Sequence, residues 1–193
     1  MRVAVLGWGS LIWDPRKLRL KETGWQLADL RLPIEFSRIS SDGRLTLVID
    51  EESGTNVPVA FAESSMRRLG NAIRNLRDRE GCSAAAIGVV TGKLVIRSRS
   101  QAIGMQIRDW SSASGFSAVI WTDLEPNFGR FGMETGLHYL RSLDDAKAAK
   151  ARRYIALSPA LIETRFRTRL RKERWIEAAK APPKSKPSTS RPA

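Results

Sequence analysis

The sequence predicts an α+β domain, in which strands fill the first two thirds of the chain and helices the last third. Short β-branched and apolar runs bounded by turn residues continue to about residue 122, which is typical of strands. Helical spacing of apolar residues prevails from residue 134 onward,. A doubly wound parallel sheet would instead need strands and helices to alternate, so this class is disfavoured.

The first predicted strand is Arg2 to Leu6 (RVAVL), a short β-branched run,. Gly7-Trp8-Gly9-Ser10-Leu11 follows it directly. Because glycine ends strands and permits tight turns, this stretch is predicted to be a loop that can carry a site.

Three further strands are predicted before residue 63: Leu27 to Ser40, Leu45 to Asp50, and Val57 to Ala62. The turn signals Ser41-Asp42-Gly43 and Glu52-Ser53-Gly54 separate them,. Consecutive strands joined by short turns predict an antiparallel meander.

A helix is predicted over Ser64 to Arg79, with Ser64 or Ser65 as its N-cap and Gly81 as its C-terminal stop,. Glu80 stands at its end. Its apolar residues recur at helical spacing: Met66, Leu69, Ile73 and Leu76,.

The second half of the chain is predicted to hold three strands and three helices. The strands are Ala84 to Val90 and Lys93 to Arg97, which form a hairpin around Thr91-Gly92, and Ser117 to Thr122. The helices are Gln101 to Ser111, Glu134 to Tyr154, and Pro159 to Lys180.

The net charge of +13 is concentrated near the C-terminus. Residues 1–145 contain 19 Lys and Arg against 17 Asp and Glu, whereas residues 146–193 contain 14 against 3. The body of the protein is therefore nearly neutral, and the basicity indicates a separate feature of the C-terminal segment.

The last predicted helix is amphipathic, with Ile162, Phe166 and Leu170 on one face,. Basic residues crowd the remainder: Arg165, Arg167, Arg169, Arg171, Lys172 and Arg174. A solvated helix is the favoured interpretation; binding of nucleic acid or an acidic partner is the alternative. The predicted domain spans 1–178, and the Pro/Ser/Lys-rich segment 179–193 is expected to be a disordered basic tail.

Several classes of chemistry are disfavoured by composition. His138 is the only histidine and Cys82 the only cysteine, so a His/Cys metal site and an intrachain disulfide are excluded, and a reduced cytoplasmic setting is expected. No apolar run approaches the roughly 20 residues of a membrane span. Val3 to Trp13 is interrupted by Gly7 and Gly9 and lacks a cleavage site like that of a signal peptide,.

The glycine loop has two interpretations. Two glycines after a strand allow successive backbone N–H groups to converge on a carboxylate or an oxyanion. Alternatively, they only permit a tight turn beneath Trp8 and Trp13. The loop lacks the lysine of a P-loop and is not a G-x-S-x-G nucleophile elbow,.

The stretch Val5 to Trp13 (VLGWGSLIW) resembles the opening signature of the gamma-glutamylcyclotransferase family, particularly its ChaC-like branch, in which a strand leads into Tyr-Gly-Ser-Leu. Leu32 to Ser40 is similar to the family's second strand, ending in an aromatic residue and a serine, here Phe36 and Ser37. The strand before the family's catalytic helix resembles Val57 to Phe61.

The resemblance also covers Leu76-Arg77-Asp78-Arg79-Glu80, which is similar to the family's Leu-x-x-Arg-Glu. It spans Arg2 to Thr168 in order, with two departures. Trp8 replaces the usual tyrosine and so lacks its hydroxyl, and the Arg-Gly-Thr segment of the glutathione-specific branch is missing after Ser40.

The resemblance implies an antiparallel or mixed β-barrel flanked by helices, and an enzyme that cyclises a small γ-glutamyl compound to 5-oxoproline, releasing an amine, without cofactor or metal. It implies that Glu80 is the general acid/base. It further implies substrate contacts from the loop and the second strand: Gly7, Trp8, Gly9, Ser10, Leu11 and Ser37.

Alternatives remain for these residues. Glu80 could be an exposed carboxylate paired with an arginine, although helical geometry predicts that Arg77 and Arg79 diverge from it. Asp123 and Glu125 form a backup acid/base pair, for which a structural turn before Pro126 is the favoured interpretation,. A protein of the same fold that binds a ligand or partner without catalysis is the rival function.

Overall fold

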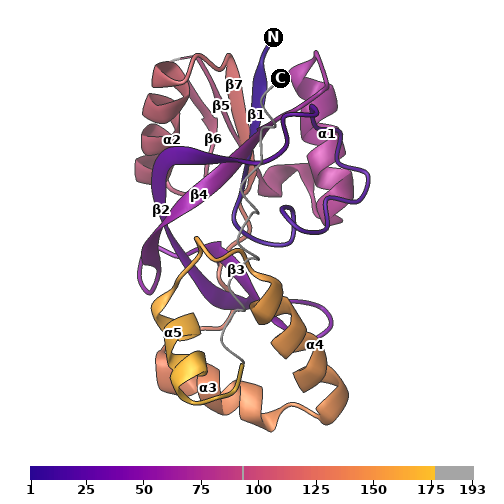
Figure 1. Ribbon diagram of the computed structural model, residues 1–193. Coiled ribbons are helices and arrows are strands. Elements are labelled where there is room, and N and C mark those ends of the chain that lie inside the picture. The colour runs from indigo at the N-terminus through magenta and orange to yellow at the C-terminus, as the bar shows by residue number, and fades with distance from the viewer. Residues whose placement is uncertain (93, 177–193) are drawn as a thin grey trace, which may run out of the picture.

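The computed structural model describes residues 1–92 and 94–176 and confirms the α+β class (Figure 1). A seven-stranded mixed sheet has the order β3-β2-β4-β1-β7-β5-β6. Its strands are β1 (Val3–Gly7), β2 (Gln26–Ile39), β3 (Leu45–Ile49), β4 (Thr55–Glu63), β5 (Ile87–Thr91), β6 (Leu94–Arg97) and β7 (Ala118–Thr122). The α-helices of the described residues are α1 (Leu69–Glu80), α2 (Gln101–Ala113), α3 (Met133–Ser142), α4 (Asp145–Leu157) and α5 (Arg165–Lys172).

The sheet is open, so the barrel predicted from the resemblance is wrong. Strands β3 and β6 are its two edges and do not pair with each other. The meander is also wrong, because β4 pairs with β2 on the side opposite to β3. Strand β2 is long enough to pair with both neighbours: β4 pairs along Gln26 to Ile34, and β3 pairs along Ile34 to Ile39.

Helices cover the sheet in two layers and also pack at one end. Helix α1 packs over one face, where Leu76 is buried with Val5 and Ile120. Helix α2 covers the opposite face, where Ile107 is buried beside Val119. Helices α3, α4 and α5 gather at the end of the sheet formed by β3 and the last part of β2 (Figure 1).

Helix α1 begins at Leu69, five residues later than predicted. Ser64 is not its N-cap: its N–H donates to the carbonyl of Val3 at 2.8 Å, and Ser64 forms an isolated bridge with Leu20. Pairing with the sheet therefore outweighs the local capping preference. The predicted C-terminal stop is confirmed, because Gly81 has φ 65°, a left-handed conformation that glycine adopts readily,.

The two long C-terminal helices predicted from the sequence are both shorter in the structure. Leu143 is extended, and the Asp144 side chain accepts a hydrogen bond from the N–H of Lys147, so α4 starts anew. Helix α5 likewise starts only after Thr164, whose hydroxyl accepts from the N–H of Arg167 at 3.1 Å. The predicted tail, 179–193, lies outside the described residues.

A buried carboxylate joins the C-terminal helices to the sheet. Glu35 on β2 is 1% exposed. It accepts hydrogen bonds from the N–H of Phe36 (2.9 Å), the hydroxyl of Thr55 (3.3 Å) and the N–H of Phe166 at the start of α5 (3.4 Å). Desolvation by burial raises the pKa of Glu35 to about 6, although a hydrogen bond from Thr164 and those from the other donors oppose the rise,.

We expect Glu35 to make the stability of the fold pH-dependent. The folded protein binds the proton of the Glu35 carboxyl group more tightly than the unfolded chain does. The contribution of protonated Glu35 to the free energy of unfolding is therefore complete below the ordinary glutamate pKa of 4.5 and is lost as pH rises through about 6,. The loss amounts to about 2 kcal/mol. Urea unfolding between pH 4.5 and 7 measures it.

Glu35→Gln should make the free energy of unfolding less dependent on pH between 4.5 and 7. Glu52→Gln, which changes an exposed carboxylate, should leave that pH dependence as it is in the wild type. An unchanged slope in Glu35→Gln would assign the pH dependence to other groups.

Candidate functional site

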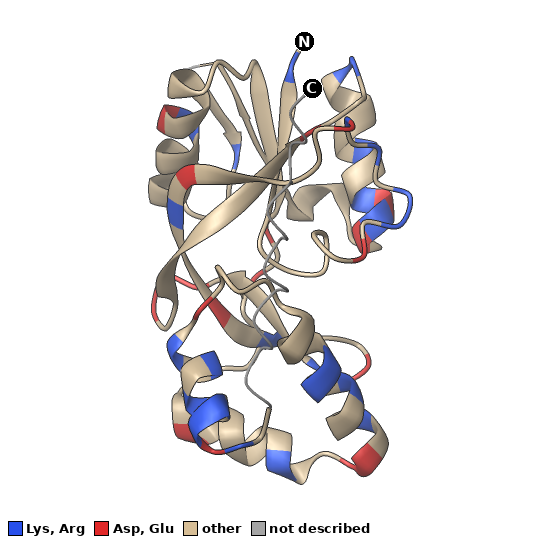
Figure 2. Cartoon of the chain, in the orientation of Figure 1, with Lys and Arg blue, Asp and Glu red and all other residues tan. Residues whose placement is uncertain are grey.

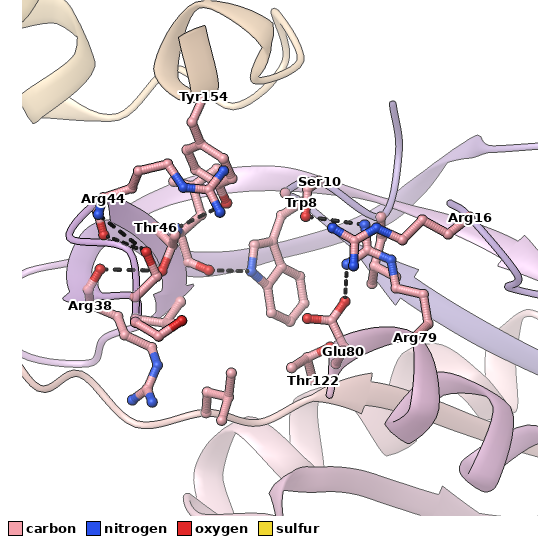
Figure 3. Close-up of a pocket in the computed structure, with 17 residues that line it drawn as sticks. Trp8, Ser10, Arg16, Arg38, Arg44, Thr46, Arg79, Glu80, Thr122 and Tyr154 are labelled. Carbon is pink, nitrogen blue, oxygen red and sulfur yellow. Dashed lines mark hydrogen bonds and ion pairs between the residues drawn. The ribbon is translucent and has the colours of Figure 1, made fainter. Parts of the chain in front are cut away.

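A cavity of about 320 Å³ opens where the end of the sheet meets α1 and α4 (Figure 3). Six parts of the chain line it: the loop after β1, the end of β2, β3 with the residues before it, the end of α1, the residues at the end of β7, and α4. Its lining residues are Trp8, Gly9, Ser10, Leu11, Arg16, Arg38, Ser40, Ser41, Arg44, Thr46, Leu47, Val48, Arg79, Glu80, Thr122, Leu124 and Tyr154.

The parallel pair at the centre of the sheet positions one side of the cavity. Strands β1 and β7 run in the same direction, with Val5 opposite Ile120. Their carboxyl ends therefore meet at one edge, where ligands commonly bind in sheets of this kind. Trp8 to Leu11 leave β1 there, and Thr122 ends β7 beside them.

The loop after β1 offers unused backbone donors. The N–H of Ile12 donates to the carbonyl of Gly9 (3.0 Å) and that of Asp14 to the carbonyl of Ser10 (2.9 Å), so the segment forms a helical turn. The first N–H groups of such a turn have no partner within it. Within residues 1–92 and 94–176, nothing accepts a hydrogen bond from the N–H groups of Gly9, Ser10 or Leu11.

The glycines of this loop permit close approach of aromatic side chains. Neither Gly7 nor Gly9 has a positive φ, so neither uses the left-handed conformation that glycine allows. A Cβ on Gly7 would lie 2.7 Å from the ring of Trp25, and one on Gly9 would lie 3.0 Å from the hydroxyl of Tyr154. Gly7 does not line the cavity, so it is removed from the predicted substrate contacts.

Glu80 lies in the cavity wall and is held by Arg79, contrary to the predicted divergence of the two side chains. Their Nη1 and Oε1 atoms are 2.5 Å apart, and the Arg79 side chain is 3% exposed. The other terminal nitrogen of Arg79 donates to Ser10 Oγ (3.2 Å) and to the carbonyl of Asp14 (2.5 Å). Arg79 thus ties the catalytic candidate to the loop after β1 (Figure 3).

Burial raises the pKa of Glu80 above its usual value. Desolvation is the largest cause and outweighs the attraction of the carboxylate to Arg79 and to the more distant Arg16. The Glu80 side chain is 16% exposed, so it remains accessible from the cavity. A carboxyl group with these properties can take up and return a proton nearer neutral pH than a solvated glutamate.

Two hydroxyl groups complete the cavity. The hydroxyl of Tyr154 on α4 accepts from the N–H of Leu47 at 3.4 Å, and its own proton has no acceptor within the described residues. Burial raises the pKa of Tyr154 to about 12, so it stays a neutral donor. The hydroxyl of Thr122 is buried without a partner in the described part of the chain. The indole N–H of Trp8, by contrast, is occupied by the carbonyl of Leu47 at 3.3 Å.

Three other predicted site residues lie outside the cavity. Ser37 is fully buried on β2 and does not line it. The carboxylate of Asp123 accepts from the N–H of Arg99 at 2.7 Å, and Glu125 is exposed. The backup acid/base pair is thus separated from the cavity, because Thr122 and Leu124 face it and the alternating residues point elsewhere,.

The cavity residues that the sequence did not single out are mostly arginines and hydroxyls: Arg16, Arg38, Arg44, Thr46, Thr122 and Tyr154. A partial signal exists for Arg38 and Arg44. They flank the turn Ser41-Asp42-Gly43 almost symmetrically, which brings both to the same end of a hairpin,. Nothing local in the sequence indicates that this hairpin faces the loop after β1.

Lys and Arg residues recur along α4 and α5 (Figure 2). On α5, however, three of the arginines have partners within the described residues. Arg167 was predicted on the basic face of α5, yet it is 1% exposed and binds backbone carbonyls. Arg169 pairs with Glu134 and Glu173, and Arg171 pairs with Glu163. These internal pairs reduce the charge that α5 offers to a nucleic acid.

The described residues contain no group of three or more His, Cys, Asp or Glu side chains arranged to hold a metal ion. In that same part of the chain, every helix is too short or too polar to cross a membrane. Comparison with protein-family models, curated proteins and solved structures finds no match to this chain.

Proposed function

We propose that this chain is a gamma-glutamylcyclotransferase-like enzyme, which cyclises a γ-glutamyl compound to 5-oxoproline and releases an amine. The observation that carries the proposal is the juxtaposition of a desolvated carboxyl group with unused backbone donors in one cavity. Glu80 supplies the carboxyl group, and Gly9, Ser10 and Leu11 supply the N–H groups.

The reaction needs little besides positioning and a proton carrier. The α-amine of the substrate attacks its own γ-carbonyl carbon; a C–N bond forms in the five-membered ring, and the bond to the departing amine breaks. Nucleophile and electrophile belong to one molecule, and such proximity contributes up to roughly 7 to 11 kcal/mol when geometry is ideal. The protein must hold the bent conformer and move one proton.

Glu80 is the proton carrier in this proposal. Its carboxylate accepts the proton that the attacking amine loses and delivers it to the departing nitrogen, so no net proton is consumed. Positioned general acid/base groups accelerate such steps by about 10² to 10⁴. The ion pair with Arg79 and the bonds from Arg79 to Ser10 and Asp14 hold the carboxylate in position.

The other donors match the charges of the substrate. The N–H groups of Gly9, Ser10 and Leu11 suit its α-carboxylate, because clustered backbone donors bind anions. The free proton of Tyr154 suits the γ-carbonyl oxygen, on which negative charge develops during attack,. The family's tyrosine hydroxyl is missing here because Trp8 stands in its place, and Tyr154 supplies a hydroxyl to the cavity instead.

The test is the release of 5-oxoproline from a panel of γ-glutamyl compounds, followed together with release of the free amine. Equimolar release of both products is expected. Each compound is paired with its N-acetyl derivative, in which the acetylated α-amine cannot attack; those derivatives should not react. Release of glutamate instead of 5-oxoproline would indicate hydrolysis, and binding without any product would favour the non-catalytic, ligand-binding alternative.

Tyr154→Phe is expected to lower kcat by roughly tenfold to a hundredfold, because one donor to the developing oxyanion is removed. The ring should remain packed against Trp13 and Phe36, which lie 5.3 and 6.4 Å away between ring centroids. Steady-state kinetics measure the effect, and thermal unfolding checks the fold. A Tyr139→Phe control removes a hydroxyl bonded to the carbonyl of Gly43, away from the cavity lining, and should leave kcat unchanged.

A further inference from the structure

The charge of residues 1–145 is nearly balanced in total but unevenly distributed. Two segments, 14–22 and 64–78, contain eight Lys and Arg against three Asp and Glu, whereas the remainder of residues 1–145 contains eleven against fourteen. The first segment belongs to the connection between β1 and β2, and the second leads into α1 and forms most of it. Positive charge is therefore concentrated on α1 and on the loop beside this helix, as Figure 2 shows.

Hydrogen bonds hold the two segments side by side. The side chain of Asn75 on α1 accepts from the N–H of Arg19 at 2.7 Å and donates to the carbonyl of Lys17 at 2.9 Å. The carbonyl of Arg19 accepts in turn from the N–H of Ser65 at 3.0 Å. The loop backbone is thus fixed against the helix, and the cations of the two segments share one surface on a rigid scaffold.

Five cations of this surface form no ion pair within residues 1–92 and 94–176. All five are exposed, and together we call them the basic face: Lys17, Arg19, Arg67, Arg68 and Arg74. The other three Lys and Arg of the two segments each have a carboxylate partner: Arg16, Lys21 and Arg77. The basic face therefore carries positive charge that the described part of the protein does not neutralise.

The chemistry of the basic face favours a nucleic-acid backbone over a protein or a membrane. Four of its five cations are arginines, whose planar guanidinium groups bind phosphate through two parallel hydrogen bonds,. Protein interfaces usually have an apolar or aromatic centre, and interfacial membrane binding buries an apolar face. None of the large, exposed apolar side chains of the described residues lies in either segment. Nucleic-acid interfaces, by contrast, are polar and strongly positive.

We propose that the basic face binds the phosphate backbone of double-stranded nucleic acid without reading its base sequence. Segments 14–22 and 64–78 contain no aromatic residue on which an unpaired base could stack, so a single strand is disfavoured,. Contacts with phosphates position a protein on the duplex but carry no sequence information. The inference is independent of the proposed cyclisation, because the five residues lie outside the cavity lining.

The experiment measures binding of the full chain to two short, labelled duplexes of unrelated sequence by fluorescence anisotropy at several salt concentrations. Both duplexes should bind equally, with a Kd of roughly 10⁻⁶ to 10⁻⁴ M at physiological salt. The triple variant Arg67→Gln, Arg68→Gln, Arg74→Gln should weaken binding at least about tenfold. It should also make the slope of log association constant against log salt shallower by about 2.7, since each lost phosphate contact removes about 0.9. Thermal unfolding should be unchanged, because these exposed side chains form no ion pairs.

The matched control removes the same charge from the C-terminal segment, with Lys180→Gln, Lys184→Gln and Lys186→Gln. It should change the salt slope by less than about one. An equal or greater loss in this control, or absence of duplex binding, overturns the inference. So does a clear preference for one duplex, for a separated strand, for polyglutamate or for phosphatidylserine vesicles.

Discussion

Replacing Glu80 with glutamine is expected to lower 5-oxoproline formation about 10²- to 10⁴-fold. The amide cannot accept the proton of the attacking amine, so ring closure loses its proton carrier. Its oxygen can still accept the hydrogen bond that Arg79 donates, and Arg79 keeps its bonds to Ser10 and Asp14. The loss should therefore appear in kcat, while the folded state persists.

A matched control for this substitution is Glu63→Gln. Glu63 is also ion-paired, with Arg2 at 3.2 Å and Lys21 at 2.6 Å, but it lies outside the cavity. Its substitution should leave turnover unchanged. If Glu80→Gln retained full activity and thermal stability, Glu80 would be only an ion-pair partner of Arg79, and the catalytic assignment would be withdrawn.

The pH profile gives a second measure of the role of Glu80. The deprotonated form must be present to accept the proton, so kcat should fall as pH decreases through the pKa of Glu80. Desolvation raises that pKa above the usual glutamate value of 4.5. The acidic limb is therefore expected at higher pH than for a solvated glutamate, and it should be absent from the residual rate of Glu80→Gln.

Replacing Arg167 with methionine is expected to destabilise the fold by a few kcal/mol, because a buried polar group left without a partner costs about 1 to 3 kcal/mol. This is a large share of the roughly 5 to 15 kcal/mol typical of a domain. Arg167 is 1% exposed and donates to the carbonyls of Ser158 (2.5 Å), Pro159 (2.6 Å) and Ile162 (3.0 Å). Methionine fills much of the same space but leaves these buried acceptors unpaired. Urea unfolding at constant pH measures the change.

The same substitution should also make the part of the cavity wall that α4 forms less rigid. The carbonyls bound by Arg167 follow α4, which carries Tyr154, so their release loosens the end of that helix. Arg171→Met is the control on the same helix: its ion pair with Glu163 is partly exposed and is expected to contribute at most about 1 kcal/mol,. Equal destabilisation by the two substitutions would show that the carbonyl bonds of Arg167 add little.

Features that depend on neighbouring residues were predictable from the sequence. The β-branched run before Gly7 predicted β1 and the loop after it, and Gly81 predicted the end of α1, which places Glu80 at a helix terminus. Trp8 to Leu11 and Glu80 do line a common cavity. These signals succeed because strand propensity and left-handed C-caps act within a few residues.

Features that depend on the direction of a side chain were less predictable. The sequence placed Asp123 and Glu125 after a strand but could not tell which alternating set would face the cavity; the register of β7 against β1 turns Thr122 and Leu124 toward it. Arg167 was assigned to the basic face of α5 by composition, whereas the loop after α4 supplies the carbonyls that draw it inside.

By itself, the sequence determined the α+β class, the loop after β1 and the position of Glu80 at the end of a helix, since each arises from short-range backbone preferences. Tertiary structure alone decided that the sheet stays open, that Arg79 ties Glu80 to the loop after β1, and that Arg38 and Tyr154 join the same cavity. Those outcomes depend on contacts between segments distant in the chain, such as Gly9 with Tyr154. They follow from how the sheet and the C-terminal helices pack, because burial and hydrogen bonding between distant segments outweigh local preference.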